Sequence, residues 1–145
     1  MRALGLDLGS KRIGVALSNS DGTVATPYEV IVRTKDTAGD RRRLRALAEE
    51  AEAEMLVVGL PLSLDGSDGP MARRYRREAE ELGVALGLPV ELWDERFTTV
   101  TAEASLMRQD LDGKKRRQIV DKVAATVMLQ SWLDARRSTS EDERT

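Results

Sequence analysis

Cysteine and histidine are both absent from this sequence of 145 residues. Without cysteine the chain can form neither a disulfide nor a thiolate metal site, and without histidine it has no imidazole to serve as base, proton shuttle or metal ligand. Any metal ion bound by side chains must therefore be held by oxygen atoms. Oxygen ligands favour Mg²⁺ or Mn²⁺, so the carboxylates are the residues to examine first.

Long apolar runs are also missing, although 41% of the residues are hydrophobic and 33% are charged. No segment approaches the length of a membrane span, and the N-terminal residues lack the cationic and apolar regions of a signal peptide. These features predict a cytoplasmic protein with no membrane partner. The length suits one domain, which we expect over residues 1–135, with 136–145 as a polar, disordered tail.

The opening segment predicts two strands, at residues 3–8 and 13–18, joined by a tight turn. Asp7 lies inside the first strand between two leucines, where a carboxylate is costly to bury unless a metal, a proton or a partner compensates it. Glycines at positions 5, 9 and 14 would leave backbone open to a phosphate or a metal ion. Asp7 is thus the first candidate functional residue, the alternative being that it only caps the hairpin.

The remaining segments predict an α/β fold. A turn at 19–22 should return the chain as a third antiparallel strand, and the apolar run at 55–59 is typical of a strand covered by helices on both faces. We therefore expect a five-stranded mixed sheet, whose first three strands form an antiparallel meander, with helices on both faces. The expected strands are 3–8, 13–18, 24–32, 55–59 and 90–93, and the expected helices are 40–51, 71–86, 98–107 and 117–135.

Two further acidic positions fall where such a sheet places its ligands. Asp94 and Glu95 follow the last strand directly, and Asp121 lies in the final helix among apolar residues. The carboxyl ends of parallel strands share one edge, so Asp7 and Glu95 can converge there and the helix can bring Asp121 to them. The alternative is that Asp94 and Glu95 form an ordinary polar strand end.

Three converging carboxylates without histidine suit a two-metal site, with ions roughly 4 Å apart. One ion would generate the attacking hydroxide, and the other would stabilise the leaving oxygen of a phosphodiester. Each ion would also offset the mutual repulsion of the acids. The predicted activity is hydrolysis of phosphodiester bonds, with Asp7, Glu95 and Asp121 as catalytic residues and metal ligands.

A strong positive charge is lacking too, because 23 basic and 25 acidic residues give a net charge of −2. This balance argues against a uniformly basic surface but leaves room for local basic clusters. Such clusters occur near the acids and would position the backbone of a nucleic acid, where most protein contacts are made. The expected contact residues are Lys11, Arg12, Arg96, Thr98, Lys114, Lys115, Arg116 and Arg117.

Four segments resemble the YqgF family: GLDLGSKRIGVA at 5–16, VGLPLSLDG at 58–66, DERFTT at 94–99 and VDKVAA at 120–125. The family's members are described both as Holliday junction resolvases and as pre-16S rRNA nucleases. The resemblance implies a ribonuclease H-like fold, a bacterial cytoplasmic protein that matures the 5′ end of 16S rRNA, and an acidic triad that matches Asp7, Glu95 and Asp121.

Several alternatives stay open. The substrate could be branched DNA in place of precursor rRNA, or the chain could be a ribosome assembly factor that binds nucleic acid without cutting it. The Asp-x-Gly pattern at residue 7 also resembles the phosphate loop of actin-like kinases, but those proteins need two such domains and this chain supplies one. A homodimer contact through Trp93 and Trp132 is a further option.

Overall fold

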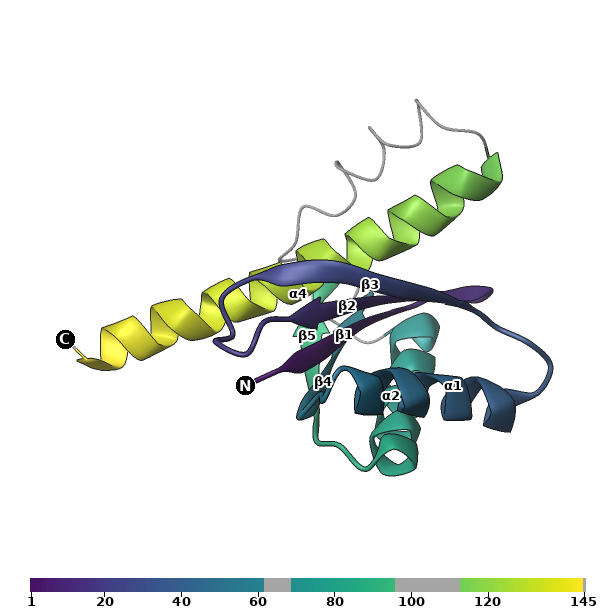
Figure 1. Cartoon of the computed structure of the whole chain (residues 1–145), viewed down its shortest axis with the longest axis horizontal. Coiled ribbons are helices and arrows are strands. Elements are labelled where there is room, and N and C mark those ends of the chain that lie inside the picture. Colours follow the sequence, from purple (N-terminus) through teal and green to yellow (C-terminus); the bar gives the residue numbers. More distant parts are fainter. Residues whose placement is uncertain (62–68, 96–112, 145) are drawn as a thin grey trace.

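The computed structural model describes residues 1–61, 69–95 and 113–144, and in the last range it describes the side chains of 121–137. Figure 1 shows a central sheet with helices on its two faces. The strands are β1 (Ala3–Leu8), β2 (Arg12–Ser18), β3 (Ala25–Val32), β4 (Met55–Leu60) and β5 (Val90–Asp94), and the helices are α1 (Thr37–Glu50), α2 (Pro70–Leu86) and α4 (Gly113–Arg144).

The five strands lie in the order β3-β2-β1-β4-β5. The first three are antiparallel neighbours, whereas β4 runs parallel to β1 and β5 runs parallel to β4. The predicted mixed sheet with an antiparallel meander is confirmed. Because β1, β4 and β5 are parallel, their carboxyl ends meet at one edge of the sheet.

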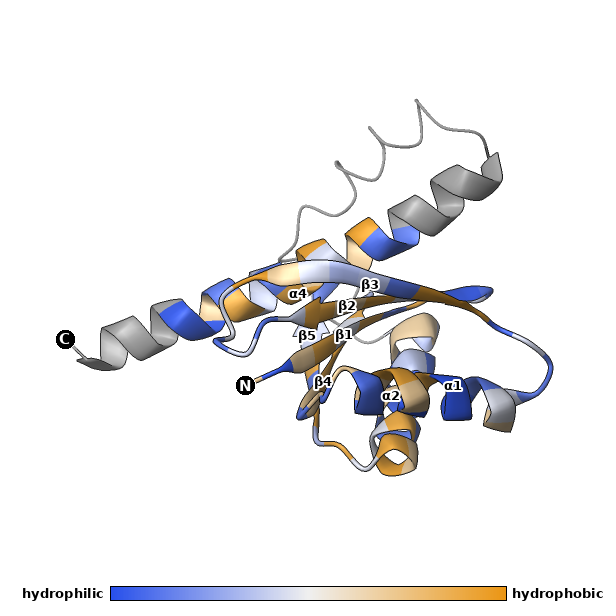
Figure 2. Ribbon diagram, viewed as in Figure 1, coloured by the Kyte–Doolittle hydropathy of each residue, from blue (hydrophilic) through white to orange (hydrophobic). Residues whose placement is uncertain are grey.

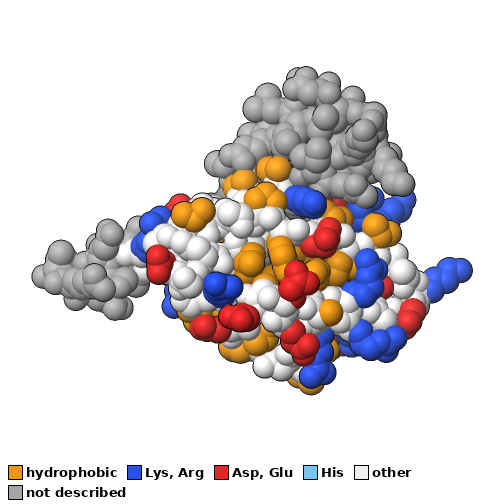
Figure 3. All heavy atoms as spheres, in the orientation of Figure 1, with side chains coloured by type: hydrophobic (Ala, Val, Ile, Leu, Met, Phe, Trp, Pro, Cys, Tyr) orange, Lys and Arg blue, Asp and Glu red, His pale blue; other side chains and the backbone are white. Residues whose placement is uncertain are grey.

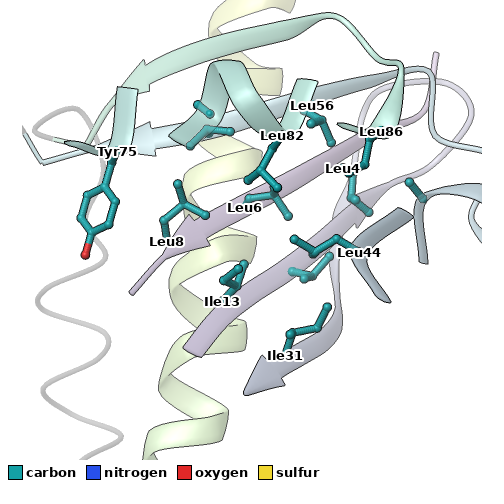
Figure 4. Close-up of a cluster of buried hydrophobic side chains, with 14 of the residues drawn as sticks. Leu4, Leu6, Leu8, Ile13, Ile31, Leu44, Leu56, Tyr75, Leu82 and Leu86 are labelled. Atoms are coloured by element: carbon teal, nitrogen blue, oxygen red, sulfur yellow. The ribbon is translucent and has the colours of Figure 1, made fainter. Parts of the chain in front are cut away.

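The two faces of the sheet are built from side chains of different size, which follows from the period of two along each strand. On one face, large aliphatic side chains pack against α1 and α2 and form the main core (Figure 4). Figure 2 shows the hydrophobic residues of the strands and of α2 in orange. On β1 this face carries Leu4, Leu6 and Leu8. The opposite face of β1 carries Ala3, Gly5 and Asp7, and it is covered by α4 (Figure 1).

Helix α4 approaches that second face closely because two strand positions have no side chain. A β-carbon on Gly5 would lie 2.9 Å from Cβ of Leu129, and one on Gly14 would lie 2.1 Å from the carbonyl oxygen of Asp121. The prediction that these glycines leave open backbone for a phosphate or a metal ion is therefore wrong. They make room for the protein's own final helix.

Helix α4 also extends beyond the predicted limits of 117–135 at both ends. The segment after residue 135, expected to be a disordered tail, continues the helix to Arg144. Near the start of this extension the guanidinium of Arg136 lies 4.6 Å from the ring centroid of Trp132, and Arg137 pairs with Asp134. These contacts join the polar turns to the packed part of the helix, which a composition argument does not detect.

None of the helices in the described part of the chain is both long and apolar enough to span a membrane. The helix predicted at 98–107 lies outside the described residues.

Candidate active site

The Asp7 and Glu95 carboxyl groups meet at the edge where the parallel strands end. Asp7 lies on β1 opposite Gly14, and Glu95 follows the last residue of β5. Their side chains are hydrogen bonded to each other. The predicted convergence of the first and last strands is therefore present, although β4 lies between them.

Gly59 of β4 makes this meeting possible. A β-carbon at residue 59 would lie 2.7 Å from Oε1 of Glu95 and 3.0 Å from its Cγ, so the Glu95 side chain crosses β4 in the space that any other residue would fill. Sequence reasoning missed this residue. The available signal was a single glycine within an otherwise apolar and fully buried strand.

Both carboxyl groups hold their protons more tightly than an exposed acid does. Burial is the largest cause in each case. It raises the pKa of Glu95 to about 8, with further increases from the charge of Asp7, the hydrogen bond to Asp7 and the charge of Asp94. The pKa of Asp7 is also raised by burial and by the charge of Asp121, against the hydrogen bond from Glu95, which lowers it. Glu95 is therefore protonated at neutral pH and donates a hydrogen bond to Asp7.

Asp121, the third predicted acid, lies beside this pair but is bonded elsewhere. Its Oδ2 accepts a hydrogen bond from Nε of Arg12 at 2.5 Å, and both side chains are 23% exposed. Its charge still acts on Asp7, which places it in the same electrostatic environment. Across the described residues no group of three acidic side chains is arranged to hold a metal ion, and Asp121 is paired with a cation.

The donor set nevertheless fits a hard divalent cation. It consists of carboxylate oxygens, as Mg²⁺ and Mn²⁺ require. The raised pKa values of Asp7 and Glu95 show that two negative charges are unfavourable at this buried position. The pair therefore retains a proton. A cation placed there would stabilise both ionised carboxylates, so that the proton would no longer be needed to offset their repulsion.

The predicted nucleic-acid contacts divide into three groups. Lys11 is exposed in the turn between β1 and β2, and Arg12 is engaged by Asp121. Arg96 and Thr98 lie outside the described residues. Residues 114–117 lie in the first turns of α4, where the backbone is helical and extends past the sheet (Figure 1).

The two tryptophans lie at the layer between α4 and the sheet. Trp132 is 4% exposed, and its indole Nε1 donates a hydrogen bond to Oε2 of Glu91 at 2.7 Å. Trp93 packs against the same apolar cluster between α4 and the sheet. Trp132 therefore belongs to the core, and a homodimer contact stays a prediction.

A family model described as "RuvX: Holliday junction resolvase" matches residues 1–135. The chain belongs to the RuvX family. This is the family identified above as YqgF, so that resemblance is confirmed.

Curated relatives extend over nearly the whole chain. A protein of Myxococcus xanthus is 46% identical over 142 residues, which cover 98% of this chain and 93% of the relative. One of Pelotomaculum thermopropionicum is 47% identical over 135 residues, covering 93% and 88%. Both are named "Putative pre-16S rRNA nuclease". The prediction that this chain is an enzyme that hydrolyses phosphodiester bonds is confirmed at the level of the family.

Solved structures agree on the fold. RuvC of Thermus thermophilus matches with a TM-score of 0.54 and 17% identity, covering 96% of this chain and 98% of that one. The Holliday junction resolvase of fowlpox virus matches with a TM-score of 0.57 and 10% identity, covering 93% and 99%. At these identities the comparison concerns the fold alone, and it confirms the predicted ribonuclease H-like architecture.

The raised pKa of Glu95 predicts how the stability of the metal-free protein depends on pH. Between its ordinary value of 4.5 and about 8, the folded state binds more protons than the unfolded state, so the free energy of unfolding falls as pH rises through this window. Glu95→Gln cannot ionise and should lose most of that fall, becoming more stable than wild type above pH 8. Urea unfolding with chelator across this range measures it, with the exposed Glu80→Gln as control. Parallel curves for wild type and Glu95→Gln would contradict the assignment.

The space over Gly59 makes a second prediction. Gly59→Ala should push the Glu95 carboxyl away from Asp7 and lower the rate of phosphodiester cleavage about 10- to 100-fold, because a displacement of about 1 Å at a reacting centre can cost this much. The matched control is Val84→Ala, an exposed change on α2. A Gly59→Ala variant that cuts as fast as wild type would show that the Glu95 position is unimportant.

Proposed function

We propose that this RuvX protein is a metal-dependent nuclease that acts in 5′-end processing of precursor 16S rRNA. The observation that carries the proposal is the pair of buried carboxyl groups, Asp7 and Glu95, that share a proton over Gly59 with Asp121 beside them. Burying acids together costs free energy and lowers stability, so a site that does so is a candidate for chemistry. The names of the relatives from Myxococcus and Pelotomaculum support precursor rRNA as the substrate.

Asp7, Glu95 and Asp121 are the side chains that would hold Mg²⁺ or Mn²⁺, as two ions. When bound, such ions make a water molecule a better nucleophile and offset the charge that develops on the phosphate. Glu95 would have to release its proton in order to hold a cation, and Arg12 fixes the position of the Asp121 carboxylate through the bond from its Nε. In this role Arg12 is a positioning residue for Asp121.

The substrate backbone would be positioned by cations around this edge. Lys11 and Arg12 lie in or next to the turn that follows Asp7, and Arg12 contacts Asp121 directly. We assign the same role to Arg96 and Thr98, which follow Glu95 directly, and to the basic run at 114–117, which precedes Asp121 on α4. Phosphate contacts of this kind fix the orientation of the nucleic acid but do not discriminate between base sequences.

A second candidate function is resolution of branched DNA, which is supported by the description of the family model. The same three acids would serve either substrate, because both reactions hydrolyse a phosphodiester. A ribosome assembly factor without cleavage is the non-enzymatic candidate, and it is disfavoured by the presence of all three acids.

Cleavage of two substrates in parallel tests these candidates. We expect wild type to cut a precursor 16S rRNA 5′ fragment with Mg²⁺ or Mn²⁺, to leave it intact with chelator, and to cut a four-way DNA junction more slowly. The cleavage rate of Asp7→Asn should fall to background because the substitution removes a carboxylate ligand. The variant should retain its fold because the side chain keeps nearly the same size and packing. Asp21→Asn, an exposed acid remote from the site, is the control.

Preference for the four-way junction would favour the second candidate. Binding without metal-dependent cutting by both wild type and Asp7→Asn would favour the assembly factor.

A further inference from the structure

A cavity of about 690 Å³ lies on the other side of the β1–β2 turn from the carboxylates. It opens between this turn, the connection from β3 to α1, and α2, and apolar side chains such as Ile13 and Leu82 contribute to its wall. Its volume is that of a pocket for a nucleotide-sized ligand. The cationic side chains that line it, here called the basic cleft, are Lys11, Arg12, Arg33, Lys35, Arg41 and Arg74.

The two acids in the wall of the basic cleft are already bonded within the protein. Glu78 accepts two hydrogen bonds from Arg33, at 2.6 and 2.7 Å. Asp40 accepts from the backbone N–H of Thr34 at 2.9 Å and from its hydroxyl at 2.8 Å, which holds the pKa of Asp40 below its usual range. Glu78 is thus paired with Arg33, whereas Asp40 is ionised and lies 4.0 Å from Arg43, a residue outside the cleft.

Three of the six cations also have partners. Arg33 binds Glu78, Arg12 binds Asp121, and Arg41 pairs with Glu81. Among the residues that the structure describes, the structure records no acidic partner for the remaining three, which are Lys11, Lys35 and Arg74. A chain with a net charge of −2 thus gathers uncompensated positive charge in one cavity. Figure 3 shows Lys and Arg side chains around this end of the molecule, near the β3–α1 connection.

The frame around the basic cleft is fixed before any ligand arrives. Nε of Arg33 donates to the carbonyl of Gly9 at 2.7 Å, and its backbone N–H donates to the carbonyl of Lys11 at 2.8 Å. Arg33 therefore ties the β1–β2 turn to Glu78 of α2, which fixes the backbone of the turn that carries Lys11.

We propose that the basic cleft binds a nucleotide unit of the substrate strand through its backbone phosphate, with Lys11, Lys35 and Arg74 as the phosphate-binding cations. The inference rests on the proposed nuclease function and extends it. The β1–β2 turn follows Asp7 directly, and its Arg12 reaches Asp121 on the opposite face. A strand that is cut at the carboxylates can therefore continue around this turn into the cleft, which then holds the segment next to the cleaved bond.

The test is a binding measurement that does not depend on cleavage. Wild type and Lys35→Gln/Arg74→Gln are titrated with a short labelled RNA strand in chelator over a range of salt concentrations. The matched control is Arg73→Gln/Arg77→Gln, which removes the same charge from exposed positions of α2 outside the cleft. We expect the cleft variant to bind about tenfold more weakly than the control. The slope of its log affinity against log salt concentration should be shallower by the equivalent of about one to two phosphate contacts.

Equal affinity and equal salt slope for the two double variants would overturn the proposal. A second contradicting result would be that wild type binds inorganic phosphate or a mononucleotide as tightly as the RNA strand and that the cleft variant loses this binding. The cavity would then be a site for a small anion. Failure of the nuclease function itself has a different signature, namely loss of metal-dependent cutting in wild type while the difference between the double variants in strand binding persists.

Discussion

The contact between the Asp7 and Glu95 carboxyl groups is the interaction on which the rest of the site depends. It joins strands that are not neighbours, and it exists because Gly59 on the intervening strand has no side chain. The same device operates on the other side of Asp7, where Gly14 admits the backbone of α4 and so brings Asp121 close. Two absent β-carbons thus allow three acids from distant parts of the chain to occupy one edge of the sheet.

Local patterns in the sequence predict the strands and their connections, because a strand shows either alternating apolar and polar residues or a continuous apolar run within a few consecutive positions. They also place Asp7 and Glu95 at strand ends that a parallel sheet brings together. They do not predict that Asp121 pairs with Arg12, which lies 109 residues away. Nor do they distinguish a glycine that makes room for a ligand from one that makes room for a helix, since both are simply a glycine within an apolar strand. Gly5 and Gly14 proved to be of the second kind.

The β1–β2 turn separates two regions of opposite charge. On the α4 side lie acids that keep a proton because burial removes the solvation of their charged forms and neighbouring carboxylates repel them. On the side of α1 and α2 lie Lys11, Lys35 and Arg74. Arg12 connects the two regions through its bond to Asp121. A modest net charge is therefore compatible with binding a polyanion, because the positive charge is concentrated where the strand would pass.

Calorimetric titration with Mn²⁺ or Mg²⁺ near pH 7, in buffers of different ionisation enthalpy, tests the central claim most directly. If Asp7 and Glu95 form the metal site, binding to wild type must release roughly one proton, because Glu95 with a pKa of about 8 is protonated beforehand. Binding to Glu95→Gln, if it occurs, should release none. Metal binding by wild type without proton release, or equal release by both proteins, would contradict the account and place the metal elsewhere.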